Sequence, residues 1–205
     1  MSSTAELTNK ELSLINDREF LLAKREIIDK IHLQFGQVEK RLHPLVQAQS
    51  FPEGVLTRAG KISKGDSYQG LPYLVLDYPR AFDKQGIFAF RTMFWWGHHF
   101  SSTLHLGGDY LDYYRSVLLK NLEDLTHNEG YFCVNNGPWH YHYQSSNYLP
   151  YKQMDPSVIK DSLAHKPFIK LSQRWSLDYF HQLPKLVSNH FLWLMSWIQE
   201  VRNSH

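Results

Sequence analysis

Three apolar runs near the middle of the chain, separated by Pro, Asp and Gly, carry the clearest pattern in the sequence. They span residues 71–76, 87–96 and 100–106. Runs of this length between turn-forming residues are typical of consecutive strands joined by short connections. We therefore predict an antiparallel β-meander between Gly70 and Gly108, with Val55–Ser63 as a weaker strand at its edge.

The middle run is apolar on both of its faces. Alternation along a strand divides its side chains into two sets: Ile87, Ala89, Arg91, Met93 and Trp95 on one face, and Phe88, Phe90, Thr92, Phe94 and Trp96 on the other. A strand that is apolar on both faces must be covered on both. We therefore place this strand in the centre of the sheet, with helices or a second layer above and below it.

Apolar residues at helical spacing predict the helices that cover the sheet. The longest begins at Asn16 or Asp17 and runs for about 30 residues, which is on the order of 45 Å. Leu, Ile and Phe recur along it every seven residues, and this narrow seam packs on its own domain or pairs with another helix. Shorter helices are predicted after Asp109, from Asp155 to about His165, and from Pro184 onwards.

These elements predict an α+β fold, in which an antiparallel β-meander sheet is covered by a long N-terminal helix and by C-terminal helices. A chain of 205 residues is long enough to bury one substantial core. We therefore expect a single domain over residues 1–205, with residues 1–15 as a flexible lead-in.

Arg91 is the charged residue inside the apolar middle run. A guanidinium does not lose its proton, and an unpaired buried charge is costly, so this group must meet a carboxylate or a bound anion. Asp77 is the nearest acidic residue on the preceding strand. One interpretation is a structural Arg91–Asp77 pair, and the other is an anion-binding arginine in a pocket.

The strand that follows carries a column of polar residues. If Gly97-His98 forms a two-residue turn, Trp96 lies opposite His99 and Phe90 lies opposite His105. One face would then carry His99, Ser101, Thr103 and His105 beside Phe90 and Phe94. Such a column is either an exposed flank of the sheet or the lining of a cleft, and the sequence favours the exposed flank.

The Asn136-Gly137 pair predicts a second hairpin, in which Tyr131–Val134 returns as Trp139–Tyr143. This register places Cys133 opposite His140. One hypothesis is that Cys133 and His140 form a nucleophilic pair. The alternative is that Cys133 is a small buried apolar residue, which is the more common role of a lone cysteine.

Histidines of this hairpin suggest a metal site. His140 and His142 point to the same side of a strand, and a third ligand such as His105 or His99 would complete a zinc site. The competing interpretation is that these are half-exposed sheet histidines that make ordinary hydrogen bonds.

The charge of the chain argues against a nucleic-acid partner. The net charge is +2 with neutral histidines, and the pI is about 8.5, without a basic stripe. Trp193 and Trp197 lie four residues apart on the predicted last helix, where they widen the core or form a subunit interface.

The location is expected to be cytoplasmic. The longest apolar cluster, Phe191–Ile198, is far shorter than the ~20 residues of a membrane span. No secretory signal is visible at the start of the sequence. The single Cys133 excludes an intramolecular disulfide and fits a reducing compartment.

Three functions from different classes are compatible with these patterns. The first is a small-molecule site, enzymatic or not, in which Arg91 binds an anionic group, with Asp77, Tyr78, His99 and His105 nearby and Trp95 or Trp96 as a wall. The second is a non-catalytic, homo-oligomeric interaction module. The third is a metal-dependent hydrolase that uses zinc. Nucleotide-binding, hydrolase and redox signatures such as GxxxxGK[ST], GxSxG, HExxH and CxxC are missing from the sequence, so no catalytic residue or cofactor is identified.

Overall fold

The structure is a computed structural model and describes residues 6–199. Its contacts divide the chain into two units, with the boundary between Leu33 and Gln34. The first unit contains helix α1 (Asn9–Asn16) and the beginning of helix α2 (Arg18–Gln47). The prediction of a helix that begins at Asn16 or Asp17 is confirmed, because Asp17 Oδ1 accepts a hydrogen bond from the backbone of Phe20 at 2.8 Å.

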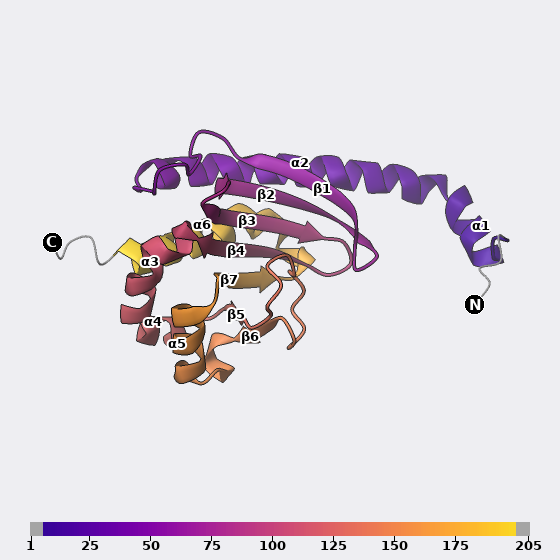
Figure 1. Ribbon diagram of the computed structural model, residues 1–205. Helices are drawn as coiled ribbons and strands as arrows, with labels where there is room; N and C mark the ends of the chain where they lie inside the picture. The colour runs from indigo at the N-terminus through magenta and orange to yellow at the C-terminus, as the bar shows by residue number, and fades with distance from the viewer. Residues whose placement is uncertain (1–5, 200–205) are drawn as a thin grey trace. The chain divides into compact units, whose positions relative to one another are not determined.

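The second unit is built on a seven-stranded antiparallel sheet with the order β1-β2-β3-β4-β7-β5-β6 (Figure 1). The strands are β1 (Lys61–Tyr68), β2 (Leu71–Phe82), β3 (Gly86–Trp95), β4 (His99–Gly108), β5 (Tyr131–Cys133), β6 (Tyr148–Pro150) and β7 (Phe168–Trp175). The α+β class is confirmed, and β1 to β4 form the predicted meander. The edge strand predicted at Val55–Ser63 lies later in the chain, since β1 begins at Lys61 and only Leu56 makes an isolated bridge before it.

The remaining helices follow the meander. They are α3 (Asp109–Lys120), α4 (Leu122–His127), α5 (Pro156–His165) and α6 (Leu183–Gln199), with short 3₁₀ helices η1 (Tyr151–Gln153) and η2 (Leu177–Gln182). The predicted start of α5 is confirmed, because Asp155 Oδ1 accepts from the backbone of Ser157 at 2.8 Å, with Pro156 as first helical residue. No helix within residues 6–199 is both long enough and apolar enough to cross a membrane.

Helices cover one face of the sheet, which we call the helical face. Phe90 of β3 packs against Phe191 of α6, with 5.1 Å between ring centres, and Phe88 packs against Tyr110 of α3 at 6.3 Å. In the second unit the part of α2 from Gln34 onwards also packs here, because His43 Nδ1 lies 2.9 Å from the hydroxyl group of Tyr78 on β2. The apolar set predicted around Phe90 therefore forms the core.

The tryptophans of α6 are part of this layer. Trp197 is buried, and its indole nitrogen donates to the carbonyl oxygen of Asn121 at 2.7 Å. Trp193 is half-buried and stacks on Trp197 with 6.1 Å between ring centres. These contacts support the interpretation that Trp197 widens the core.

The opposite face of the sheet is covered by an irregular segment, residues 134–147, which we call the covering loop. Its two ends are joined by a hydrogen bond from the Val134 nitrogen to the Asn147 carbonyl at 2.8 Å. Its middle is held down by Tyr68 of β1, whose hydroxyl oxygen accepts from the backbone nitrogens of Tyr141 and His142 at 2.6 and 3.0 Å. Both faces of the sheet are therefore covered, as we predicted: one by helices and the other by the irregular covering loop.

The predicted hairpin of Tyr131–Val134 with Trp139–Tyr143 is wrong. Strand β5 pairs instead with β6 and β7, and Cys133 lies opposite Tyr148. Asn135 Oδ1 accepts from the Gly137 nitrogen at 2.7 Å, so the side chain of Asn135 closes the local turn. The chain then crosses over the sheet instead of returning along β5.

The predicted two-residue turn at Gly97-His98 is also wrong. Trp95 lies opposite His99, so the connection contains three residues, with Gly97 at a φ of 69°. The His98 ring stacks on Trp95 at 3.6 Å and shields that end of the strand. One additional loop residue shifts the register by one, and this moves the polar column of β4 from the face of Phe90 to the face of Arg91.

Candidate functional site

Arg91 and Asp77 form a buried, bidentate ion pair, as one of our two interpretations predicted. Arg91 Nε donates to Asp77 Oδ1 at 2.7 Å, and Nη2 donates to Oδ2 at 2.8 Å. The two residues lie directly opposite each other on β3 and β2. Both side chains are largely buried, with 14% and 6% exposed. Arg91 Nη1 makes no hydrogen bond to any group that the structure describes, so one edge of the guanidinium stays available.

A pocket of about 340 Å³ opens beside this pair. We call it the Arg91 pocket, and its lining is Tyr68, Tyr73, Val75, Arg91, Met93, Trp139 and Tyr141. Strands β1 to β3 supply the floor, and the covering loop supplies Trp139 and Tyr141. Aromatic walls around one charged group are typical of sites for small ligands.

Tyr141 lies between this pocket and the interior of the covered face. Its ring centre is 4.9 Å from the guanidinium carbon of Arg91 and 4.7 Å from Lys170 Nζ. Its hydroxyl group is 3.2 Å from His105 Nδ1. Burial raises the pKa of Tyr141 to about 12, so the phenol is neutral at physiological pH.

Lys170 is fully buried on β7, opposite His105 of β4. Its ammonium group donates to the carbonyl oxygen of His140, and the rings of Tyr141, Tyr148 and Phe168 surround it. No carboxylate of the described part of the chain lies within ion-pair distance of it. Burial lowers the pKa of Lys170 from 10.5 to about 8.

The polar column of β4 is buried beneath the covering loop, so the predicted exposed flank is wrong. His99, Ser101, Thr103 and His105 are all buried. Thr103 and Ser172 share a hydrogen bond of 2.7 Å, while His99 Nε2 and His105 Nε2 have no partner among residues 6–199. Burial lowers the pKa of His105 to about 3, and of His99 to about 4, so both rings are neutral at pH 7.

The covered face carries more cationic than anionic groups. Arg91, Lys170 and Arg174 contribute cations from β3 and β7, whereas Asp77 is the carboxylate that pairs with one of them. Arg174 lies at the exposed margin, with its guanidinium 5.0 Å from the ring centre of Tyr143. This excess of positive charge favours an anionic ligand over a cationic one.

The structure separates the predicted site residues into two groups. Asp77, Arg91, Trp95, His99 and His105 share the covered face. Trp95 backs the pocket through its contact with Tyr68, at 5.1 Å between ring centres.

Tyr78 and Trp96 lie on the helical face, away from the pocket. The hydroxyl group of Tyr78 is 2.9 Å from His43 of α2 and donates to the Thr57 carbonyl at 2.9 Å. Trp96 packs against Phe94. Tyr78 directly follows Asp77, and because side chains alternate along a strand it points to the face opposite that of Asp77.

Sequence reasoning missed Lys170, Tyr141, Tyr73 and Trp139. A signal for Lys170 was present, because it is a single charge inside the apolar run Phe168–Leu171, the same anomaly that identified Arg91. No comparable signal in the sequence distinguishes Tyr73, Tyr141 and Trp139 as site residues, since aromatic residues are common throughout the chain.

The proposed zinc ligands are not brought together. The rings of His140 and His142 are 5.9 Å apart, whereas His105 packs between Trp139 and Phe168. In the described ranges there is no group of three or more His, Cys, Asp or Glu residues with a geometry that could hold a metal ion. Cys133 is buried, with its sulfur 3.5 Å from Asn147 Oδ1.

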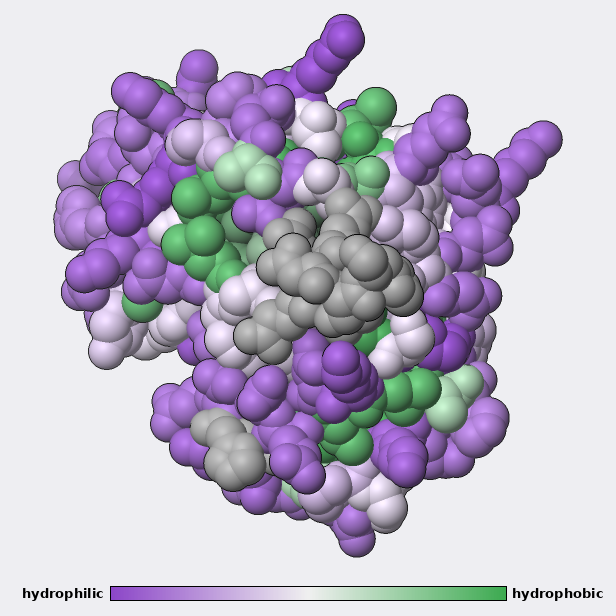
Figure 2. Space-filling model, turned by 90° about the vertical axis from the view of Figure 1, so that its left-hand side faces the viewer, coloured by the Kyte–Doolittle hydropathy of each residue, from purple (hydrophilic) through white to green (hydrophobic). Residues whose placement is uncertain are grey.

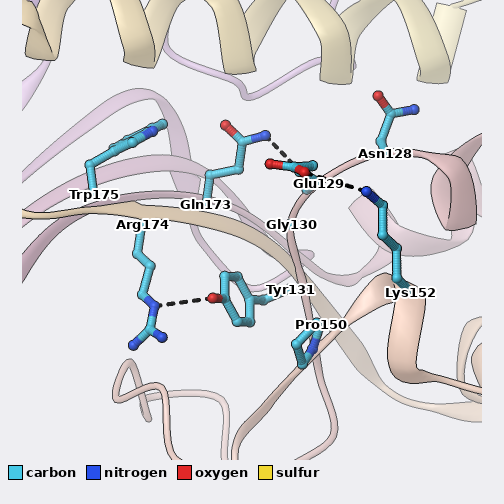
Figure 3. Close-up of a pocket in the computed structure, with 9 residues that line it drawn as sticks. All are labelled: Asn128, Glu129, Gly130, Tyr131, Pro150, Lys152, Gln173, Arg174 and Trp175. Carbon is cyan, nitrogen blue, oxygen red and sulfur yellow. Dashed lines mark hydrogen bonds and ion pairs between the residues drawn. The ribbon is translucent and has the colours of Figure 1, made fainter.

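A second pocket, of about 350 Å³, lies where β7 extends beyond its pairing with β5 (Figure 3). Its polar groups are paired with one another, because Lys152 reaches Glu129 at 3.3 Å and Arg174 Nε donates to Tyr131 Oη at 3.2 Å. Figure 3 shows the Arg174 side chain pointing away from Trp175 and lying beside the ring of Tyr131. The Lys152–Glu129 ion pair of this second pocket is exposed to solvent, so water screens its charges and they attract a charged ligand less strongly than Arg91 does.

The chain matches none of the family models, none of the curated proteins and none of the solved structures with which it was compared.

Proposed function

We propose that the chain binds a small anionic ligand with a flat, apolar body in the Arg91 pocket. The observation that carries this proposal is a buried guanidinium with one unengaged edge, in the lining of a pocket with aromatic walls. The flat walls favour a planar ligand body, because ring faces and edges pack well against it. The unengaged Nη1 favours a carboxylate or a similar anion, since hydrogen bonds between charged groups are the strong ones.

Benzoate is a suitable probe, with benzamide as its neutral analogue of the same shape. Trp139 lines the pocket, so its indole N–H signal in a nitrogen–proton NMR spectrum, assigned with Trp139→Phe, reports binding. We expect a saturable shift with benzoate and binding of benzamide that is weaker by roughly tenfold, about the strength of one charge-assisted hydrogen bond.

The variant that tests the role of the guanidinium is Arg91→Met/Asp77→Leu. It removes both charges together and leaves no unpaired carboxylate in the core. The preference for benzoate should disappear in this variant while the fold persists. Arg58→Met is the matched control, because Arg58 is exposed and outside the pocket lining. A preference that survives in the double variant, or a Trp139 signal that does not move, would refute the proposal.

A specific observation also favours an interaction module as a second candidate. Many of the exposed large apolar side chains lie in the first unit: Leu7, Leu12, Leu14, Ile15, Phe20, Leu21, Leu22, Ile27 and Leu33. Those of the second unit are scattered over separate elements. On the face drawn in Figure 2, hydrophobic side chains likewise form separate groups between hydrophilic ones. Concentrated apolar exposure of this kind is typical of an association surface.

Self-association of the full chain tests this second candidate. The measurement is molar mass by light scattering over a wide concentration range. Leu22→Glu, on α2, should convert an oligomer into a monomer, whereas Leu192→Glu, which changes another exposed leucine on α6, should not. A wild-type chain that is monomeric at every concentration would remove the candidate.

A further inference from the structure

Lys170 does not line the Arg91 pocket, but its Nζ lies 4.7 Å from the ring centre of Tyr141, which does line it. We infer that the ligand of the Arg91 pocket is an oxo acid, whose carboxylate is held by Arg91 while Lys170 forms an imine with its carbonyl group. This inference rests on the proposed function, because Arg91 supplies the anion-binding end of the site.

The surroundings of Lys170 are those of a nucleophilic amine. Its side chain is fully buried and contacts three aromatic rings, with the carbonyl oxygen of His140 as its hydrogen-bond acceptor. Lysines are activated as nucleophiles by desolvation in apolar surroundings or by a neighbouring cation, because both favour the neutral amine. Lys170 has both conditions, since Arg91 and Lys166 are close enough to disfavour its charge.

Burial outweighs the titratable groups that face Lys170. They are Arg91, His105, Cys133, Tyr141, His142, Tyr148 and Lys166. The neighbouring Cys133 favours the ammonium ion and raises the pKa of Lys170, whereas Arg91 and Lys166 lower it, and the phenols and His105 are neutral at pH 7. Burial is the largest influence and lowers the pKa of Lys170 to about 8, so a fraction of the amine is neutral near physiological pH.

The separation of the two cationic groups limits the size of the ligand. Arg91 and Lys170 contact the same ring, at 4.9 Å and 4.7 Å from the centre of Tyr141. Their separation therefore cannot exceed the sum of these two distances. This upper bound favours a small oxo acid, with the carboxylate and the carbonyl group on no more than one ring.

Tyr141 controls access from the pocket to the amine. It lines the pocket, it belongs to the covering loop, and its hydroxyl group is held by the 3.2 Å contact with His105 Nδ1. Movement of this side chain joins the Arg91 pocket to the Lys170 amine. The carbonyl group of the ligand then occupies the space of the tyrosine ring.

The chemical step requires no oxidant and no cofactor. The lone pair of the neutral Lys170 nitrogen attacks the carbonyl carbon, and the π electrons move to oxygen to give a carbinolamine. The carbinolamine loses the oxygen as water, which carries away the two protons that the amine nitrogen gives up. A C=N bond remains between the ligand and Lys170.

The test uses the full chain with 4-formylbenzoate and sodium cyanoborohydride, which reduces an imine to a stable amine. Peptide mass spectrometry then measures the labelling rate of each lysine. We expect Lys170 to react roughly tenfold or more faster than the exposed lysines, as an activated amine should. The neutral analogue 4-formylbenzamide should label Lys170 more slowly than 4-formylbenzoate, and Lys170→Met should lose the preferred label.

Two further variants complete the test. Tyr141→Ala should raise the labelling rate of Lys170, because it removes the side chain that blocks the amine. Arg91→Met/Asp77→Leu should reduce the rate with 4-formylbenzoate to that of the neutral analogue.

The outcomes separate this inference from the proposal on which it rests. If Lys170 is labelled no faster than exposed lysines in both the wild type and Tyr141→Ala, the imine is refuted. In that case benzoate binding at Trp139 decides separately whether the anion site stands. If Lys170 is labelled equally by both aldehydes and in the double variant, the oxo-acid assignment and the role of Arg91 fail together.

Discussion

Replacement of Arg91 by Met should destabilise the protein far more than replacement of Arg91 and Asp77 together. In the single variant the Asp77 carboxylate, which is 4% exposed, loses its bidentate partner at 2.7 and 2.8 Å and stays in the core as an unpaired charge. Breaking a buried pair in this way costs about 3–5 kcal/mol. Replacing both members with apolar residues of similar volume is expected to be nearly neutral, within about 1 kcal/mol.

Urea unfolding followed by circular dichroism measures the difference. With a slope of about 2 kcal/mol per M, the single variant should unfold at a urea concentration lower by roughly 1.5–2.5 M. Asp77→Leu alone completes the double-mutant cycle and should also be destabilised, since it leaves the guanidinium of Arg91 unpaired. If both single variants and the double variant lose the same small amount, the pair is not electrostatically coupled and the reasoning about this buried charge is wrong.

Four more predictions concern titration and backbone geometry. The pKa of Lys170 is about 8 in the folded protein and 10.5 in the unfolded chain, so the unfolded chain binds more protons between these pH values. The stability of the wild type should therefore rise over this range by roughly 2–3 kcal/mol relative to that of Lys170→Met, as urea unfolding at several pH values would measure. His190 is buried with its pKa lowered from 6.5 to about 3, so stability should fall as the pH drops through this window, and His190→Gln should show a shallower loss in acid denaturation. Gly108 has a φ of 61° and an added Cβ would lie 2.3 Å from the Gln85 carbonyl, so Gly108→Ala should cost more than about 1 kcal/mol. Gly36 on α2 has open space around it, so Gly36→Ala should stabilise the chain by about 0.5–1 kcal/mol, and urea unfolding of the two glycine variants would measure both changes.

The elements that depend on local pattern agreed with the sequence. The alternation along residues 87–96 correctly divided the side chains of β3 between two faces, because a strand has a period of two whatever its neighbours are. The capped starts of α2 and α5 were also correct, since a cap depends on residues within one turn of the helix start.

The elements that depend on loop length were not predicted. One extra residue between β3 and β4 was enough to turn the histidine column from one face to the other. The stretch after β5 contains a strong hairpin dipeptide, yet it lies across the sheet, because Tyr68 and Asn147 bind its backbone and β6 takes the place beside β5. Tyr68 is far away in the chain and β6 is a competing strand, so no local pattern reveals this path.

The sequence by itself determined that β3 would be buried on both sides and that Arg91 would need a carboxylate or a bound anion, because the cost of an unpaired buried charge does not depend on the details of the fold. Only the tertiary structure decided that Lys170 and Arg91 would meet at one tyrosine ring, beneath a loop without regular structure. The physical reason is that contacts between side chains on non-adjacent strands follow from sheet register and loop path, which are set by the packing of the whole chain.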